Sequence, residues 1–405
     1  MTGFKVLGIS ITKAGIAGVL TLAASTVYAI DAQGVRVHGF FSQAATVSKN
    51  VNVRGDSTHG SFDFTEIGIN ISAPIMSNLR AAGQVVSVKT GADKSSEPEI
   101  DFLLMDWTFI DSGTSNGGLR LGKVRLPNGL HYPARDVAAV RPGIFMPQSV
   151  YLDNLGSRAF LYSTEGVQFY FNTFGENVRW QFIGHYISDQ EVSERVELAA
   201  LRRALPGAYR ITNGAFVSIR RDSLARNLTH SLTHGWAEND YKRASADPVN
   251  SSFIDYSETI YSLQYTLERF QLTTELDRRA ISLGLDSSFA TISDKYVSFG
   301  AYIEARFIPT ESFEWFIRYD ELNQQAGDRR GVERSKKTGL PRHYSFARDT
   351  SVGARYGFGN GVSLLGEFHY VDGLETADAS DNDDYLTGQL SRYWSYASVM
   401  MAYRF

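Results

Sequence analysis

Apolar and polar residues alternate at every second position along most of the chain, as expected for β-strands that present an apolar face to one side. The alternation is clearest over 65–71, 297–307 and 352–358, where Ile, Val, Phe and Tyr recur on one parity. It predicts sixteen strands, with fourteen and eighteen as alternatives because residues 211–236 alternate less regularly. The predicted strands span 35–47, 61–73, 79–90, 100–110, 119–126, 163–172, 178–187, 211–222, 227–236, 253–267, 270–279, 295–307, 313–323, 346–358, 362–372 and 391–405.

The breaks between these strands alternate in length. Short turns follow every even strand, whereas longer and more polar segments follow the odd ones. This asymmetry is typical of transmembrane barrels. None of the ten prolines lies inside a predicted strand, as a closed ladder of hydrogen bonds requires. We therefore predict an all-β fold, a transmembrane antiparallel β-barrel of about sixteen strands, which is wide enough to hold an aqueous channel.

The alternation continues to the last residue, through Val399, Met401, Tyr403 and Phe405. An exposed aromatic edge strand would promote aggregation of a soluble protein, whereas a strand with one face toward lipid explains the pattern. Chains inserted into the bacterial outer membrane typically end in this way. The alternative is the edge strand of a soluble sandwich.

The first 29 residues have the layout of a secretory signal peptide. Lys5 and Lys13 precede or flank an uncharged run of small and apolar residues, and Val27 and Ala29 occupy the positions before a cleavage site. The run is too short for a comfortable membrane span of about 20 residues. We predict a signal peptide over 1–29 and a single barrel domain over 30–405. A retained N-terminal anchor helix is the alternative.

Composition excludes several classes of function. The chain has no cysteine, which excludes disulfides, thiol catalysis and cysteine-ligated metals. Its 25 Phe and 21 Tyr are spread out, and no long apolar run follows the signal, so a helical membrane protein is excluded. A net charge of −4 gives no basic stripe for nucleic acid. No motif joins a nucleophile to a base, so we expect no enzymatic activity, no cofactor and no metal.

The longest break, 127–162, contains four of the ten prolines and a set of apolar residues unusual for a loop in water. Val137, Val140, Ile144, Phe145 and Met146 need a surface to cover them. We expect this third long loop to fold into the lumen and narrow the channel. The alternatives are a loop that caps the barrel from above and one that packs between subunits.

Charged residues gather on this loop and on the strand before it. Residue parity places Arg120 in the lumen and Lys123 outside. A narrow site of low dielectric magnifies fixed charges, so a few residues can set ion preference. The predicted constriction residues are Arg120, Arg125, Arg135, Asp136, Arg141, Arg318 and Arg355. Other charges of lumen parity are expected to be solvated wall residues: Arg179, Glu275, Asp277, Arg279, Glu304, Arg306, Asp320 and Glu367.

A basic run occupies the long break at 324–345. It holds Arg329, Arg330, Arg334, Lys336, Lys337 and Arg342. Two interpretations are open: the run bridges anionic lipopolysaccharide, or it is a solvated charged face.

Taken together, the signal peptide, the opening strand VRVHGFFSQA, the strand rhythm, the long third loop and the closing YRF resemble a Gram-negative outer-membrane porin. The stretch LGKVRLPNGLHYPARDVAAVRPGIF is also similar to the phosphate-selective-porin-like proteins, although the arginine and lysine ladder of a phosphate-selective pore is absent. The resemblance implies passive diffusion of small hydrophilic solutes or ions through a homotrimer. It also implies contact with outer-membrane lipid and lipopolysaccharide, and delivery by the barrel-assembly machinery through Phe405.

Other functions are alternatives to a general porin. A substrate-specific channel for anions, sugars or organic acids is favoured by the proline-rich loop. A plugged, energy-coupled transporter would need a globular N-terminal plug, and only five residues separate Ala29 from the first predicted strand. An outer-membrane enzyme and a purely structural barrel are the other two classes.

Overall fold

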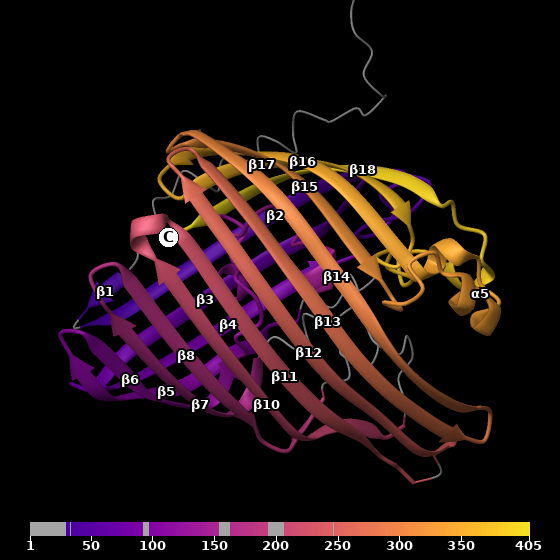
Figure 1. The fold of residues 1–405 in the computed structure, drawn as a ribbon, viewed down its shortest axis with the longest axis horizontal. Coiled ribbons are helices and arrows are strands. Elements are labelled where there is room, and N and C mark those ends of the chain that lie inside the picture. Colours follow the sequence, from indigo (N-terminus) through magenta and orange to yellow (C-terminus); the bar gives the residue numbers. More distant parts are fainter. Residues whose placement is uncertain (1–29, 33, 92–96, 154–162, 193–205, 246) are drawn as a thin grey trace, which may run out of the picture.

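The computed structural model describes residues 30–32, 34–91, 97–153, 163–192, 206–245 and 247–405 (Figure 1). Sixteen long strands form one antiparallel sheet that closes on itself, because β18 pairs with β2. The strands are β2 (Val35–Lys49), β3 (Ser61–Met76), β4 (Leu79–Thr90), β5 (Glu99–Ser112), β6 (Ser115–Arg125), β7 (Ser163–Phe174), β8 (Val178–Ile187), β10 (Ala208–Ser223), β11 (Leu228–Lys242), β12 (Val249–Leu267), β13 (Phe270–Ser287), β14 (Thr291–Thr310), β15 (Phe313–Asn323), β16 (Phe346–Gly359), β17 (Val362–Gly373) and β18 (Tyr393–Arg404).

The predicted fold class and all sixteen predicted strands are confirmed. Two short strands are added, β1 (Ile30–Ala32) beside β2 and β9 (Gln190–Glu191) beside β10. Among the described residues, six short helical segments lie between strands: η1 (Tyr132–Ala134), α2 (Gln148–Tyr151), η3 (Leu224–Arg226), α5 (Val332–Thr338), η4 (Arg342–Ser345) and η5 (Tyr385–Thr387). Within the described ranges, no helix is long and apolar enough to cross a membrane.

The alternation of side chains sorts the barrel into an apolar outside and a mixed inside. On β3, Ile67, Ile69 and Ile71 are each about half exposed on the outer surface, whereas Phe64 and Glu66 are buried inside. Successive side chains of a strand point to opposite faces, so this single register fixes the whole strand. The outward parity predicted for β14 and β16 is confirmed in the same way by exposed Ile303 and Val352.

Short turns alternate with longer connections, as predicted, except between β13 and β14, so the barrel has a short-turn end and a long-loop end. Two prolines nevertheless lie inside strands, contrary to prediction. Pro74 is near the end of β3 and Pro309 near the end of β14, and the pairing register shifts at both places. Both strands extend further toward the short-turn end than the alternation indicated, and the irregular pairing there accommodates a residue that lacks an N–H donor.

The strands β13 and β14 are much longer than predicted, and β12 is slightly longer. Residues 280–294, expected to form a long polar connection, instead continue β13 and β14 as a hairpin joined only by 288–290. The three strands rise beyond their neighbours at the long-loop end (Figure 1). Serine, threonine and glycine occupy positions here that would otherwise be apolar, so the alternation in the sequence stops before the strands end.

Candidate functional site: the lumen loop and the channel wall

The segment that follows β6, described here to residue 153 and called the lumen loop, lies inside the barrel. It contains η1 (Tyr132–Ala134) and α2 (Gln148–Tyr151). Ile144 and Phe145 are buried in a cluster with side chains of β2, β3, β17 and β18, while Met146 packs with Ile260 and Tyr302 of the opposite wall. The predicted folding of the third long loop into the lumen is therefore confirmed. Residues 154–162 of the predicted loop lie outside the described residues.

One carboxylate holds both ends of the lumen loop. Glu275 of β13 accepts hydrogen bonds from the backbone N–H of Leu130 at 2.8 Å and from the hydroxyl of Tyr151 at 2.7 Å. Ser262 and Tyr302 of the neighbouring strands also donate to it, at 2.6 and 2.8 Å. A buried carboxylate needs such donors to offset its lost hydration. Glu275 is therefore a fully bonded anchor at the base of the loop.

Two further acids anchor the middle of the loop. Glu367 of β17 accepts the N–H groups of Ile144 and Phe145, the latter at 3.3 Å. Asp320 of β15 accepts the N–H of Gln148 at 2.7 Å, at the start of α2. The loop has irregular backbone that cannot satisfy itself, so wall carboxylates provide the acceptors that buried N–H groups require.

Arginines of the same wall bind the carbonyl groups of the loop. Arg318 donates to the oxygen of Phe145 at 3.1 Å, and Arg279 to that of Val150. Arg306 donates to the carbonyl of Pro142 and Arg355 to that of Arg141, both just before the buried Ile144 and Phe145. Each guanidinium is also paired with an acid, for example Arg318 with Glu304 at 2.7 Å. We call this wall, β13 to β17 with its acids and arginines, the clamped wall.

Of the predicted wall charges, Arg179 on β8 is exposed as expected, whereas the other seven are correctly placed but not solvated. The prediction that they are solvated is wrong, because the loop covers them and because the wall and the loop satisfy each other's polar groups. The residues concerned are Glu275, Asp277, Arg279, Glu304, Arg306, Asp320 and Glu367.

Two of the predicted constriction arginines on the loop are also buried. Arg135 donates to Asp153 at 2.9 Å and to the carbonyl of Tyr151 at 2.8 Å. Arg141 pairs with Glu66 of β3 at 2.9 Å, and both side chains are at most 2% exposed. These two arginines hold the loop to itself and to the wall of β3.

The remaining predicted residues fall on two sides of the lumen. Arg318 and Arg355 belong to the clamped wall, and Asp136 pairs with Arg125 at 2.8 Å. Lys123 donates to the carbonyl of Ile100 at 2.7 Å rather than entering the lumen, which agrees with its predicted parity. The assignment of the seven residues to a constriction stays a prediction.

On the opposite side, formed by β4 to β10, several arginines keep access to water, among them Arg120 and Arg220. The side chains of Arg120 on β6 and Arg220 on β10 are 32% and 35% exposed, each beside a single acid, Asp106 at 3.1 Å and Asp222 at 3.0 Å. We call this side the open wall. The alternation along β10 shows that Arg220 points into the lumen. Phe216 and Ser218, which share its parity, are buried inside, whereas Val217 and Ile219 face outward.

Tyr132 of η1 faces the open wall from the loop. Partial burial raises the pKa of its phenol, and the nearby charges of Arg120, Arg220 and Arg125 act in the opposite direction. The phenol is therefore neutral, within the electrostatic range of three guanidinium groups. Tyr132 and Arg220 were not among the residues predicted from the sequence.

A cavity of about 400 Å³ lies below the loop, at the short-turn end of β14 to β17. Ala139 of the lumen loop forms one wall, and Glu314, Arg355 and Arg404 are among the residues of the others. Among the residues that the structure describes, no three His, Cys, Asp or Glu side chains are placed to hold a metal ion. The cavity itself is lined by charged, hydroxyl-bearing and apolar residues and by three glycines.

No model of a known protein family and no curated relative matches the sequence, but solved structures match nearly the whole chain. The trimer form of OmpT, an outer-membrane protein of Vibrio cholerae, is 9% identical with a TM-score of 0.53, over 92% of this chain and 99% of that one. The anion-selective porin from Comamonas acidovorans is 13% identical with a TM-score of 0.52, over 92% and 99%. The outer-membrane channel DcaP of Acinetobacter baumannii is 8% identical with a TM-score of 0.57, over 94% and 100%.

These likenesses establish the fold. The chain forms the closed, sixteen-stranded antiparallel barrel of the porins. At identities this low the solute and the oligomeric state of those proteins do not transfer with the fold.

Proposed function

We propose that the protein is a porin of the Gram-negative outer membrane, through which small hydrophilic solutes or ions diffuse passively. The observation that carries the proposal is an irregular loop held inside a closed barrel whose outer face is apolar. Backbone of this kind is tolerated at membrane depth only where protein buries it or where it lines water. No enzymatic role is part of the proposal.

The proposal includes a location and an assembly. A signal peptide over 1–29, which lies outside the described residues, would export the chain to the outer membrane. There the outer face would contact lipid and lipopolysaccharide, and the long-loop end would face the medium. The closing Phe405 would direct the chain to the barrel-assembly machinery. A homotrimer is supported by the trimer form of OmpT, whose fold this chain shares.

We infer an anion preference for the passage beside the open wall. Arg120 and Arg220 retain exposed guanidinium groups there, whereas the arginines of the clamped wall are taken up by the loop. Fixed positive charge in a narrow passage favours anions. A channel specific for one anion, sugar or organic acid is the second candidate, favoured by how completely the loop is bonded into the lumen. The likeness to phosphate-selective-porin-like proteins stays a prediction, since no family model matches.

Single-channel currents in planar bilayers under a KCl gradient test both parts of the proposal. Stable conductance whose steps appear in groups of three supports a trimeric porin. A reversal potential shifted toward the equilibrium potential of chloride supports the anion preference. A very small current that one added solute blocks would favour the specific channel. Folded protein that never conducts would contradict the porin function altogether.

A further inference from the structure

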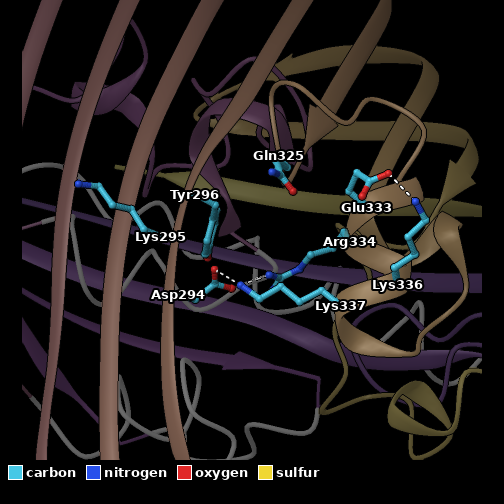
Figure 2. A pocket seen from close by; sticks show the side chains of 8 residues that line it. All are labelled: Asp294, Lys295, Tyr296, Gln325, Glu333, Arg334, Lys336 and Lys337. Carbon is cyan, nitrogen blue, oxygen red and sulfur yellow. Dashed lines mark hydrogen bonds and ion pairs between the residues drawn. The ribbon is translucent and has the colours of Figure 1, made fainter.

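At the long-loop end of the barrel, outside the passage just described, a second charged site lies between β14 and α5 (Figure 2). The pocket has a volume of about 430 Å³. It is lined by Asp294, Lys295, Tyr296, Gln325, Glu333, Arg334, Lys336 and Lys337. We infer that this pocket binds the phosphate group of an anionic ligand at the mouth of the barrel. The inference does not depend on conduction through the channel.

The pocket is preformed by the way α5 is anchored. The carboxylate of Asp328 accepts the N–H groups of Val332, Glu333 and Arg334, all at 2.8 to 2.9 Å. These are donors of the first turn of α5, which have no partner within a helix. The bonds fix the position of the short helix. As a result Arg334 and Lys337, three residues apart on one face, both reach β14.

On β14 a single carboxylate meets both cations. Asp294 pairs with Arg334 at 2.6 Å and with Lys337 at 2.5 Å, as the dashed lines in Figure 2 show. The guanidinium of Arg334 also lies over the ring of Tyr296, at 5.4 Å from its centroid. Contact with a ring and a carboxylate holds the guanidinium in one orientation. Arg334 is therefore the fixed centre of the pocket.

The charges of the pocket do not balance. Three cationic side chains, Arg334, Lys336 and Lys337, gather around two carboxylates, Asp294 and Glu333, while the fourth cation of the lining, Lys295, points away. The buried Nε of Arg334 has no hydrogen-bond acceptor. An unbonded buried donor beside surplus positive charge calls for an acceptor that carries negative charge. A phosphate group supplies three or more acceptor oxygens for the guanidinium and the two ammonium groups, more than a single carboxylate offers.

The two exposed lysines of the site can rearrange around such a ligand at little cost in free energy. Lys337 is 56% exposed and Lys336 is 69% exposed, the latter paired with Glu333 at 2.8 Å. Ion pairs this exposed contribute little free energy, because water and salt screen them. Both ammonium groups can therefore leave their carboxylates for a phosphate, while Arg334 stays in place.

Two sources could supply a phosphate at this position. Asp294 and Tyr296 share the inward parity of β14, so a phosphorylated solute entering the barrel would pass the pocket. Lys295 has the opposite parity and points away from the other labelled side chains (Figure 2), toward the side where lipopolysaccharide would lie. The recognised chemistry is the same in both cases, and experiment separates them.

The test is calorimetric titration of the folded full-length protein, in zwitterionic detergent, with pyrophosphate. We expect the Lys336→Gln/Lys337→Gln variant to bind pyrophosphate about tenfold more weakly, since two charge-assisted contacts are lost. Both side chains are exposed, so this variant should keep the fold. Arg334→Gln should abolish binding. The matched control is Arg330→Gln, which removes the same charge from the same loop outside the pocket and should change affinity less than about twofold.

The inference would be overturned if the wild type bound no pyrophosphate and if the protein also retained no lipopolysaccharide in a way that depends on Lys336 and Lys337. So would an equal loss of affinity in Arg330→Gln, since that would mean binding to net charge alone. Pyrophosphate binding in the absence of lipopolysaccharide supports the site with a soluble ligand. Retention of lipopolysaccharide that the double variant loses, without pyrophosphate binding, supports it with the lipid as the source.

Discussion

The two sides of the lumen use the same residue type for different purposes. On the clamped wall, Arg279, Arg306 and Arg318 are at most 6% exposed and bind carbonyl groups of the lumen loop. On the open wall, Arg120 and Arg220 are about one-third exposed and have no loop carbonyl as a partner in the structure. What an arginine does in this barrel depends on whether irregular backbone lies opposite it.

The difference matters for any argument from charge to selectivity. A guanidinium bound to a carbonyl and a carboxylate inside protein is a structural link, and its charge is neutralised locally. A guanidinium beside water acts on passing ions. Substitutions on the two walls should therefore separate into those that change stability and those that change ion preference.

The largest expected effect is that of Glu275→Ala on the clamped wall. Four donors lose their acceptor, including Leu130 and Tyr151 at the two ends of the loop. We expect a loss of about 4 kcal/mol in the free energy of unfolding, measured by urea titration in detergent. Conductance should rise and become unsteady as the loop detaches. Glu176→Ala, in an exposed short turn, is the control, and a similar loss there would contradict the anchor role.

The next largest effect is expected for Arg318→Met, with a loss of about 3 kcal/mol in the free energy of unfolding. Glu304 keeps Arg306 as a partner at 2.7 Å, so its charge is not left alone, but the carbonyl of Phe145 loses its donor. The matched change on the open wall is Arg120→Met. It should cost about 1 kcal/mol or less, because its ion pair is partly hydrated. Equal losses in the two unfolding titrations would remove the distinction between the walls.

A pair of glycines gives a smaller effect. A Cβ at Gly353 would lie 2.5 Å from the ring of Phe316 and 2.9 Å from Glu367, an anchor of the loop, whereas a Cβ at Gly366 would meet no atom within 4 Å. Gly353→Ala should therefore cost about 2 kcal/mol and Gly366→Ala less than about 0.5 kcal/mol. The same urea titration measures both. A neutral Gly353→Ala would mean that the clamped wall repacks freely.

The smallest change in the free energy of unfolding is expected for Arg220→Gln and its control Arg221→Gln. This pair is also the most direct test of ion preference. Arg220 faces the lumen, whereas Arg221 has the outward parity and lies over Trp180. We expect stability to be unchanged within about 0.5 kcal/mol in both. The chloride-to-potassium permeability ratio from reversal potentials should fall about twofold only in Arg220→Gln. A fall of the same size in Arg221→Gln would indicate a general surface-charge effect.

The architecture could be predicted from the sequence because a two-residue period is local information. Each strand carries its own alternation, so all sixteen were found, as was the apolar loop over 127–162 that needed a cover. The heights of β13 and β14 could not be predicted, because Ser282, Gly284 and Ser293 interrupt the apolar parity while pairing with the neighbouring strand continues.

The roles of the charged residues were harder to predict, because they depend on contacts between distant segments. Parity placed Arg318 and Glu367 in the lumen but could not show that the loop would cover them. Arg220 was missed because the register of β10 shifts between Ile211 and Asn213, which reverses the apparent parity of the strand. Tyr132 has no sequence signal, since its position follows only from how the loop crosses the lumen.

The seam where β18 meets β2 has a consequence for the order of assembly. Thr46 and Ser398 bond at 2.8 Å across 352 positions of sequence, and the ring of Phe405 occupies the space where a Cβ on Gly39 would lie. The two termini of the sheet therefore complete each other, and contacts of this sequence separation form slowly. A nascent chain has an open, aggregation-prone edge until β18 has been synthesised. Closure of the barrel must therefore wait for the last strand of the sheet, whichever strands have paired before it.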